Sequence, residues 1–578
     1  MAPTDQLQEV KIMLHGTAAS EGIGIGKVML IEEHSLEYTP RTVTDTEAES
    51  QRFKAAVDAF CYNTEKQAEN LRSSAGEKEA EILAGHIQII KDPYLSGEIE
   101  KLIADGQCAE SALEHMCDMF IAMFSAADDE LTKQRAADVR DIKSGVLGIL
   151  LGVNEIKVSD APKGTVLVAR ELTPSVTAGI VKENIAGIIT ETGGTTSHSA
   201  ILARALEIPA VLSVEGVASS LKNGDTVVVD GSEGAVIVNP DDNTVAEYSK
   251  KRDAFLAEHK ELENYRGRET KSASGEVYEL FCNIGKPEDA VKAVDADGEG
   301  VGLFRTEFLF MDRTSIPTED EQFDAYKKAA LILKGKSLII RTLDIGGDKD
   351  IPYLGLEKEE NPFMGFRAIR YCLKNRELFK SQIKAILRAS AFGDIKIMFP
   401  LITTMDELRE GKKLVIECKA DLRNMGINFN ENIQVGVMVE TASAAVIADM
   451  LAKEADFFSI GTNDLTGYTM ACDRGNNDVS YLYSPLQPSV LRMIKRTIEC
   501  GVQNGISVGM CGEAAANKLM IPLLISFGLT EFSVSAPSVL NVRKIISTWT
   551  KEEADKVTAK VLEMSTQQEI VEYLKSVV

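Results

Sequence analysis

The sequence predicts a multidomain α/β protein. A helical bundle interrupts its N-terminal α/β domain, and a (β/α)8 TIM barrel forms its C-terminal half. The chain of 578 residues is too long for one compact core, at roughly 150 residues per domain. Helical spacing dominates residues 42–151, and β-rich segments lie on both sides of that region. Beyond residue 271, strand-like apolar runs alternate eight times with helix-length segments.

The β-rich segments of the N-terminal half belong together although a long helical region separates them. GIGIGKVMLIE precedes the helical region, and GTVLVAR, IAGIIT, PAVLS, DTVVVD and AVIVNP follow it. Glycine and proline separate these short β-type runs, as is typical of strands joined by turns. We therefore expect residues 1–41 and 152–240 to form one α/β domain, with residues 42–151 inserted as a helical bundle.

Residues 241–270 differ from the sequence on either side. They are highly charged and contain only sparse apolar residues, at Val245, Tyr248, Phe255 and Leu262. A helix of this composition buries little surface. We expect an exposed linker helix that marks a domain boundary, with the barrel in residues 271–578.

The eight strand-like runs of the barrel half are YELFCNI, VGLFR, SLIIRTLD, IKIMFPL, IQVGVMVE, FFSIGTND, SVGMCGE and EFSVSA. Functional residues of a TIM barrel gather at the C-terminal ends of its strands. Five chemically active side chains occupy such ends: Arg305, Arg341, Glu440, Asp464 and Cys511.

Composition excludes several classes of protein. No stretch approaches the ~20 consecutive apolar residues of a membrane span. The formal net charge of −25 disfavours nucleic acid and anionic membranes and favours a basic protein partner. The first residues, MAPTDQLQEVKIML, lack the basic and apolar regions of a secretion signal, so a cytoplasmic location is expected. Nine cysteines without a CxxC pair suit reduced thiols.

One histidine lies in a sequence suited to phosphate chemistry. In GGTTSHSAILARALEIPA, His198 follows two glycines and precedes Ile201, Leu202 and Leu206 at helical spacing. Glycines let the backbone approach an anion, and a helix N-terminus stabilises phosphate. Arg204 is a candidate for an additional cation. An isolated histidine at such a position more often caps a helix or packs, so the wider sequence must decide.

The barrel half has no histidine, so its chemistry must use arginine, carboxylates, lysine or cysteine. Planar guanidinium groups suit phosphate and carboxylate, and four of them occur on separate segments, at Arg305, Arg341, Arg367 and Arg474. Glu440 and Asp464 offer hard oxygen ligands for Mg²⁺, although a lone acid at a strand end is usually a helix cap. Cys511 precedes a glycine turn and is a candidate proton donor, with core packing as the alternative.

These motifs resemble a known family. GGTTSHSAILAR and LTPSVTAG are similar to the phosphohistidine segment shared by enzyme I, pyruvate phosphate dikinase and phosphoenolpyruvate synthase. NPFMGFRAIR, FFSIGTNDLTGYTMACDRGN, LYSPLQPSVL and MCGE resemble the enzyme I family of the bacterial sugar phosphotransferase system, over nearly the whole chain. The resemblance implies transfer of phosphate from phosphoenolpyruvate to His198 and then to the small carrier protein HPr. It also implies Mg²⁺ and a homodimer formed by the C-terminal domain.

The resemblance also implies individual roles. Thr177 would support His198, and Cys511 would protonate the enolate left by phosphate transfer. The remaining roles are phosphoryl contacts at Arg305, Arg341 and Arg474, substrate contacts at Lys349, Arg367 and Asn463, and metal ligation at Glu440 and Asp464. This chain departs from the family at Thr195, where relatives carry arginine, so the charge around His198 is expected to be weaker. Glu21 stands where relatives usually have proline, and VETASAA has alanine where relatives usually have the proline of Glu-Thr-Pro.

In this family the helical insert receives HPr. EKEAEILAGHIQIIKD and KQRAADVRDI resemble the relevant helices, and the candidate contacts are Glu77, Glu81, His86, Ile87 and Ile89. Each of these residues is equally compatible with an ordinary surface or core position.

Two other functions compete with this interpretation. A dikinase or synthase would need a nucleotide-binding domain, and this sequence leaves no segment for one. A regulator that only carries phosphate on His198 would not need the full set of barrel residues.

Overall fold

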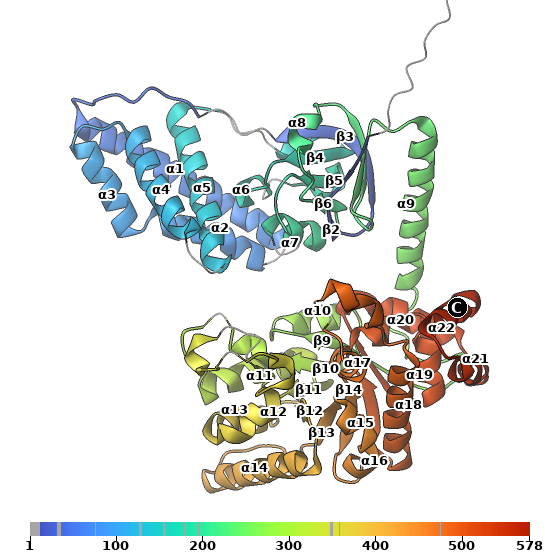
Figure 1. Cartoon of the computed structure of the whole chain (residues 1–578). Coiled ribbons are helices and arrows are strands. Elements are labelled where there is room, and N and C mark those ends of the chain that lie inside the picture. The colour runs from blue at the N-terminus through green and yellow to red at the C-terminus, as the bar shows by residue number, and fades with distance from the viewer. Residues whose placement is uncertain are drawn as a thin grey trace, which may run out of the picture. The chain divides into compact units, whose positions relative to one another are not determined.

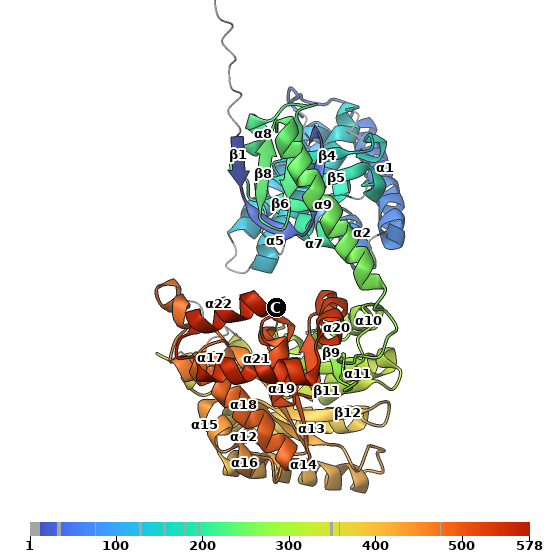
Figure 2. The same cartoon turned by 90° about the vertical axis from the view of Figure 1, so that its right-hand side faces the viewer.

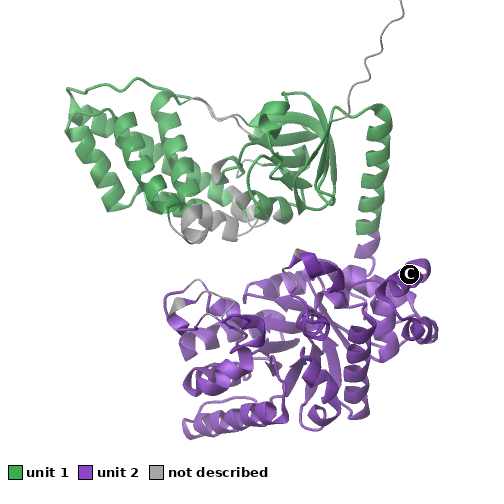
Figure 3. Ribbon diagram, in the orientation of Figure 1, with its two compact units in different colours: residues 1–259 green, residues 260–578 purple. Residues whose placement is uncertain are grey.

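The computed structural model describes residues 12–31, 36–74, 77–126, 130–153, 158–177, 180–194, 197–311, 313–346, 351–357, 359–473 and 476–578. Two compact units, residues 1–259 and 260–578, make up the chain (Figure 3). In the described parts of both units, no helix is long and apolar enough to cross a membrane.

An eight-stranded sheet forms the α/β part of the first unit (Figure 1). Its strands are β1 (Ile12–His15), β2 (Thr17–Ser20), β3 (Ile23–Ile31), β4 (Thr165–Ala169), β5 (Ile185–Thr190), β6 (Ala210–Leu212), β7 (Thr226–Asp230) and β8 (Ala235–Val238). The order is β1-β8-β7-β3-β4-β5-β6-β2, and the pairs from β3 to β6 are parallel. β4 is buried along its whole length, as its apolar sequence TVLVA requires.

A bundle of five helices lies in sequence between β3 and β4, which are parallel neighbours in the sheet. They are α1 (Thr46–Ser74), α2 (Glu77–Ile90), α3 (Pro93–Ala104), α4 (Ala109–Ser125) and α5 (Glu130–Leu151). The bundle has its own apolar core, which includes Phe53, Ile99, Leu113 and Val139. An inserted helical bundle is therefore confirmed, while the domain limits stated above stay predictions.

The remaining helices of the first unit are short except the last. They are α6 (Pro174–Thr177), α7 (His198–Ala205), α8 (Val217–Ser220) and α9 (Asp242–Glu263). α9 carries the charged sequence expected of a linker, and only two of its side chains, Thr244 and Tyr248, are buried.

The chain just after α9 is fixed to the second unit by a buried arginine. Arg543 is only 2% exposed and donates to the Tyr265 carbonyl at 3.0 Å. Its guanidinium also pairs with Asp297, whose carboxylate accepts a hydrogen bond from the Gly267 amide at 2.6 Å. A buried charge needs such partners. The C-terminal end of the linker is therefore part of the barrel unit.

Eight parallel strands close into a barrel in the second unit, which confirms the predicted TIM-barrel fold. They are β9 (Glu279–Ile284), β10 (Gly300–Arg305), β11 (Ser337–Arg341), β12 (Ile395–Phe399), β13 (Val435–Val439), β14 (Phe457–Ile460), β15 (Ser507–Met510) and β16 (Glu531–Val534). Each falls within the apolar run that predicted it, except that β10 begins one residue earlier, at Gly300. Apolar side chains fill the barrel, namely Leu303, Ile339, Met398, Met438 and Phe457, with Cys511 beside them.

Helices surround these strands, as Figures 1 and 2 show from two sides. They are α10 (Asp289–Asp295), α11 (Glu319–Leu333), α12 (Ala368–Lys374), α13 (Arg376–Ala389), α14 (Met405–Asn424), α15 (Ala442–Val446), α16 (Ala448–Leu451), α17 (Thr462–Met470), α18 (Pro488–Gln503), α19 (Ile521–Phe527), α20 (Val539–Thr548), α21 (Lys551–Glu563) and α22 (Gln567–Val577). α14 shows why they form: Thr404 and Glu407 make a capping box, and Leu408, Leu414 and Val415 bury one face.

Candidate active site

The helix predicted after the glycine pair begins at His198. Ser197 is its N-cap, and the Ser197 Oγ accepts a hydrogen bond from the Ala200 amide at 3.3 Å. Gly193 has a φ of +105°, a conformation that a residue with a side chain rarely adopts. The sequence thus sets His198 in the first turn of α7. The side chain of His198, and Thr195 as a whole, lie outside what the structure describes.

Thr177 and Arg204 have different relations to this helix. Thr177 ends α6, is buried, and belongs to a helix that packs against α7. Arg204 lies in the last turn of α7, about 9 Å along the axis from His198 at 1.5 Å per residue. Its Nη1 donates to the Ala19 carbonyl of β2 at 3.1 Å. This contact accounts for one nitrogen of the guanidinium, and the support of His198 by Arg204 stays a prediction.

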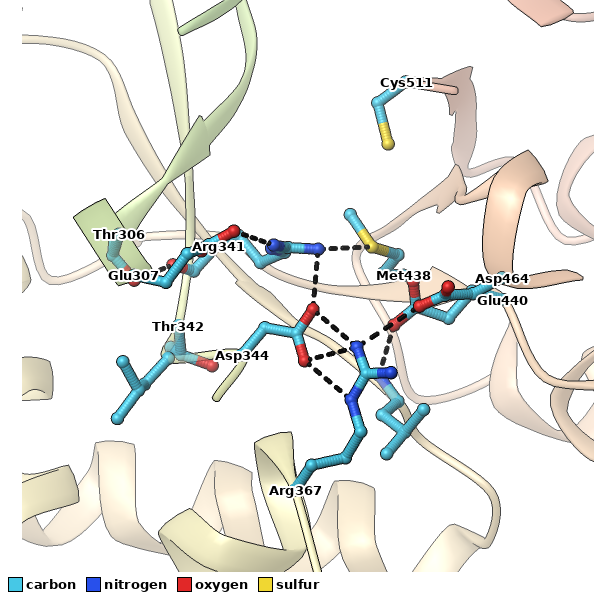
Figure 4. A network of polar contacts seen from close by, with 12 residues as sticks. Thr306, Glu307, Arg341, Thr342, Asp344, Arg367, Met438, Glu440, Asp464 and Cys511 are labelled. Atoms are coloured by element: carbon cyan, nitrogen blue, oxygen red, sulfur yellow. Dashed lines mark hydrogen bonds and ion pairs between the residues drawn. The ribbon is translucent and has the colours of Figure 1, made fainter. Parts of the chain in front are cut away.

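Two predicted arginines end neighbouring strands of the barrel. Arg305 and Arg341 are paired in register at the C-terminal ends of β10 and β11. Arg341 is buried, and its Nη2 donates to the Glu307 carboxylate at 2.6 Å while its Nη1 lies 3.0 Å from Asp344 (Figure 4). Two carboxylates thus hold the Arg341 guanidinium in place before any ligand binds.

Arg367 approaches the same carboxylate from the start of α12. Its Nη2 donates to the two oxygens of Asp344 at 2.8 and 3.0 Å and to Asp464 at 3.3 Å (Figure 4). Its Nη1 donates to the Tyr468 hydroxyl at 3.4 Å. Burial raises the pKa of Tyr468 to about 12, so its hydroxyl keeps its proton at neutral pH. Asp344 pairs with both Arg341 and Arg367 and therefore links these two arginines.

Glu440 and Asp464, the predicted metal ligands, lie beside these arginines. Glu440 directly follows β13, is 2% exposed, and accepts a hydrogen bond from the Leu401 amide at 2.7 Å. Burial, followed by the charges of Asp464 and Asp344, raises the pKa of Glu440 to about 8. Asp464 and Asn463 share the first turn of α17. The barrel mouth thus gathers acidic oxygens whose mutual repulsion a cation would relieve.

Cys511 directly follows β15 and lies among the apolar side chains inside the barrel. Its Sγ is 3.7 Å from the Ile460 carbonyl. Burial raises the pKa of its thiol to about 11, although Ser459 and the positive charge of Arg341 act in the opposite direction. The group is therefore a protonated thiol at neutral pH, which suits a proton donor.

Sequence reasoning missed three residues of this network, and it named two that cannot be placed. Glu307, Asp344 and Tyr468 contact the predicted arginines but were not singled out. The signal for Asp344 was present, since it follows β11 within RTLDIGG. Lys349 and Arg474 lie outside the described residues.

A cavity of about 440 Å³ adjoins the acidic group. Its lining comes from the segment 360–364 and from α17 and the residues after it, including Asn463, Asp464 and Tyr468. The barrel mouth therefore combines space for a small ligand with fixed cations and acids, which is typical of a binding site.

The candidate carrier contacts lie on α2. His86 is fully buried, with its ring nitrogens 3.4 Å from Asp138 and 3.7 Å from Asp141. It cannot touch a docked protein in this conformation, so its expected role as a contact is corrected. Ile87 and Ile89 are half-buried and pack against the bundle core. Glu77 and Glu81 belong to α2, but their side chains are outside the described part of the chain.

Aromatic and methionine side chains instead lie open on α3 and α4. Tyr94, Met119 and Met123 are exposed, and the Phe120 ring lies 6.3 Å from that of Tyr94 and 5.9 Å from that of Phe124. An exposed apolar group of this kind is typical of a protein-binding surface.

A closed barrel whose mouth gathers buried arginines and carboxylates beside a ligand-sized cavity is typical of an enzyme that binds a small ligand. Models of the PEP-utilising enzymes match the chain in three parts. The PEP-binding domain matches residues 259–550, the N-terminal domain matches residues 15–135, and the mobile domain matches residues 161–234.

The chain is 47% identical to the phosphoenolpyruvate-protein phosphotransferase of Bacillus subtilis (strain 168), covering 98% of this chain and 99% of that protein. It is 45% identical to the protein of the same name from Listeria innocua, covering 97% and 98%. A solution NMR structure of an enzyme I protein is 37% identical over 42% of this chain and 99% of its own, with a TM-score of 0.38. This chain belongs to the phosphoenolpyruvate-protein phosphotransferase family of PEP-utilising enzymes.

Proposed function

We propose that this chain transfers the phosphoryl group of phosphoenolpyruvate to His198 and then to a histidine of HPr, releasing pyruvate. This is the first step of sugar uptake by the phosphotransferase system. The observation that carries the proposal is the group of buried arginines and carboxylates at the barrel mouth, in a chain similar to phosphoenolpyruvate-protein phosphotransferases over nearly its whole length.

The arginines would neutralise the substrate. Arg305, Arg341 and Arg474 would contact the phosphoryl group, and Arg367, Lys349 and Asn463 would contact the rest of phosphoenolpyruvate. Arg341 and Arg367 are already oriented by Glu307 and Asp344, so little reorganisation is needed when charge moves during transfer.

Glu440 and Asp464 would hold Mg²⁺. In the described parts of the chain, no group of three or more histidine, cysteine or acidic residues forms a ready metal cage. The donors nevertheless fit a hard cation, because burial and then the neighbouring acids raise the pKa of Glu440, and a cation would offset both effects. When bound, Mg²⁺ supplies charge neutralisation for the transferring phosphoryl group.

Cys511 would complete the formation of pyruvate. Loss of the phosphoryl group leaves an enolate, and its methylene carbon takes the proton of the Cys511 thiol as the S–H bond breaks. Arg341 favours the resulting thiolate, because its positive charge opposes the rise that burial causes in the pKa of Cys511. Water then returns a proton to the sulfur.

The inserted bundle would receive HPr on the apolar side chains exposed on α3 and α4, and the net charge of −25 would attract a basic partner. From the family resemblance we also propose a cytoplasmic homodimer formed through residues 271–578.

His198 and the barrel mouth belong to different units, so transfer requires the two sites to come together.

The test is to incubate the protein with labelled phosphoenolpyruvate and Mg²⁺. We expect an acid-labile, base-stable phosphoprotein that HPr discharges. His198→Ala should form no phosphoprotein yet bind phosphoenolpyruvate like the wild type, as measured by titration calorimetry. Undiminished phosphoprotein in that variant would contradict the proposal.

A further inference from the structure

Tyr468 joins Arg367 to a loop at the barrel mouth. Its hydroxyl accepts a hydrogen bond from Arg367 Nη1 at 3.4 Å and donates one to the Phe363 carbonyl. A guanidinium can only donate and a carbonyl can only accept, so one hydroxyl satisfies both. The phenol is thus oriented by its two partners.

The other nitrogens of Arg367 have their own partners. Its Nε donates to Asp344, and its Nη2 donates to Asp344 and Asp464. Tyr468 is the acceptor that the described structure gives to Nη1. Loss of the hydroxyl would therefore free one side of the guanidinium while leaving the other side paired.

Phe363 holds the same arginine by a second route. Its ring centroid lies 5.8 Å from the guanidinium carbon of Arg367, within the range of a cation–π interaction. The Phe363 carbonyl, which accepts from Tyr468, belongs to the segment that lines part of the 440 Å³ cavity. Tyr468 lines the same cavity. The bond between them therefore links two segments of the cavity lining, and both contact Arg367.

We propose that Tyr468 is a positioning residue that orients Arg367 towards the non-transferred end of phosphoenolpyruvate and ties the segment 361–364 to that arginine. This inference rests on the function proposed above, in which Arg367 contacts the substrate outside the transferring phosphoryl group. A contact of that kind acts equally in the ground state and the transition state, so its loss raises KM and leaves kcat unchanged.

The experiment compares Tyr468→Phe with wild type in the full chain. In a His198→Ala background, titration calorimetry with phosphoenolpyruvate and Mg²⁺ gives Kd without turnover. In the protein that retains His198, the kinetics of phosphorylation by phosphoenolpyruvate give KM and kcat. We expect Kd and KM to rise about tenfold, as for loss of a hydrogen bond to a charged group, with kcat within about twofold of wild type.

Tyr353→Phe is the matched control. The Tyr353 hydroxyl also donates to a main-chain carbonyl, that of Phe310, and Tyr353 is likewise partly buried. This control should leave Kd and KM unchanged. A second test uses Arg367→Met, which removes the group that donates to the Tyr468 hydroxyl. In that background, Tyr468→Phe should change Kd less than about twofold.

Three results would overturn the inference. They are an unchanged Kd in Tyr468→Phe, a fall in kcat at constant KM, and an equal effect with and without Arg367. Failure of the wild type to bind phosphoenolpyruvate would instead refute the proposed function, and this inference with it.

Discussion

Each end of the barrel buries a carboxyl group with a pKa of about 8, and the two carboxyl groups differ in the charged side chains near them. Glu440 lies at the C-terminal end of β13, and Glu531 begins β16 at the opposite end. Burial is the main cause at both sites. Glu440 also has Asp464, Asp344, Arg341 and Arg367 near it. The charged groups acting on Glu531 are Glu279 and Lys396.

The comparison shows that a raised pKa alone does not mark an active site. Glu531 is 5% exposed, and a side chain at Gly302 or Gly509 would come within 2.8 Å of its carboxylate. It is packed into space that glycines leave open, with no cavity beside it among those described. Glu440 adjoins fixed arginines and an acid that lines a ligand-sized cavity. Nearby charged side chains and a ligand-sized cavity, both present at Glu440, are what distinguish a functional site from a packed carboxyl group such as Glu531.

The largest expected effect is from Glu440→Gln, which keeps the shape of the side chain and removes its charge. Phosphorylation by phosphoenolpyruvate should fall about a thousandfold or more, because metal ligation and charge balance are both lost. The measurement is the rate of phosphoprotein formation in excess Mg²⁺. Glu531→Gln is the matched control and should stay within about twofold of wild type. Equal losses in both variants would remove the distinction between the two ends.

Cys511→Ala should have the next largest effect. Pyruvate formation should slow about a hundredfold, because the enolate loses its proton donor, while the Kd for phosphoenolpyruvate stays unchanged. Cys282→Ala on β9 is the control, since burial also raises the pKa of that thiol but its side chain packs outside the barrel strands. Proton incorporation into pyruvate at the wild-type rate would assign the donor role to another group.

Glu531→Gln should have a smaller effect, on stability and its pH dependence. Between pH 4.5 and 8 the folded protein holds a proton on Glu531 that the unfolded chain releases, so stability falls as pH rises through this window. Glu531→Gln has no ionisable group at this position, so its stability does not fall for this reason. Its stability relative to wild type should therefore grow by up to about 1.4 kcal/mol per pH unit.

Urea unfolding of the barrel transition at pH 5, 6, 7 and 8 measures this difference. A difference between variant and wild type that does not change with pH would mean that Glu531 is ionised in the folded protein.

Sequence reasoning predicted the elements better than the contacts. Each barrel strand was predictable because a short apolar run ends in polar or glycine residues, as in IQVGVMVE and FFSIGTND. Arg341, Glu440 and Asp464 were predictable as a group, because the residues that follow the strands of a closed barrel meet at one rim. Their pairing through Asp344 was not, since it depends on which side chains face each other across the rim.

The correction at His86 has a physical cause. His86 lies in a segment rich in charged residues, yet it faces Asp138 and Asp141 inside the bundle. The polarity of a segment does not indicate which face of its helix is covered.

The central claim, that phosphate moves from the barrel site to His198, is tested most directly by locating the phosphoryl group. The wild-type protein is incubated with phosphoenolpyruvate and Mg²⁺, digested at alkaline pH to preserve phosphohistidine, and analysed by tandem mass spectrometry. The account predicts phosphate on His198 alone, lost after addition of HPr and absent from the Glu440→Gln protein. Phosphate on any other residue, or on His198 of Glu440→Gln at the wild-type level, would contradict it.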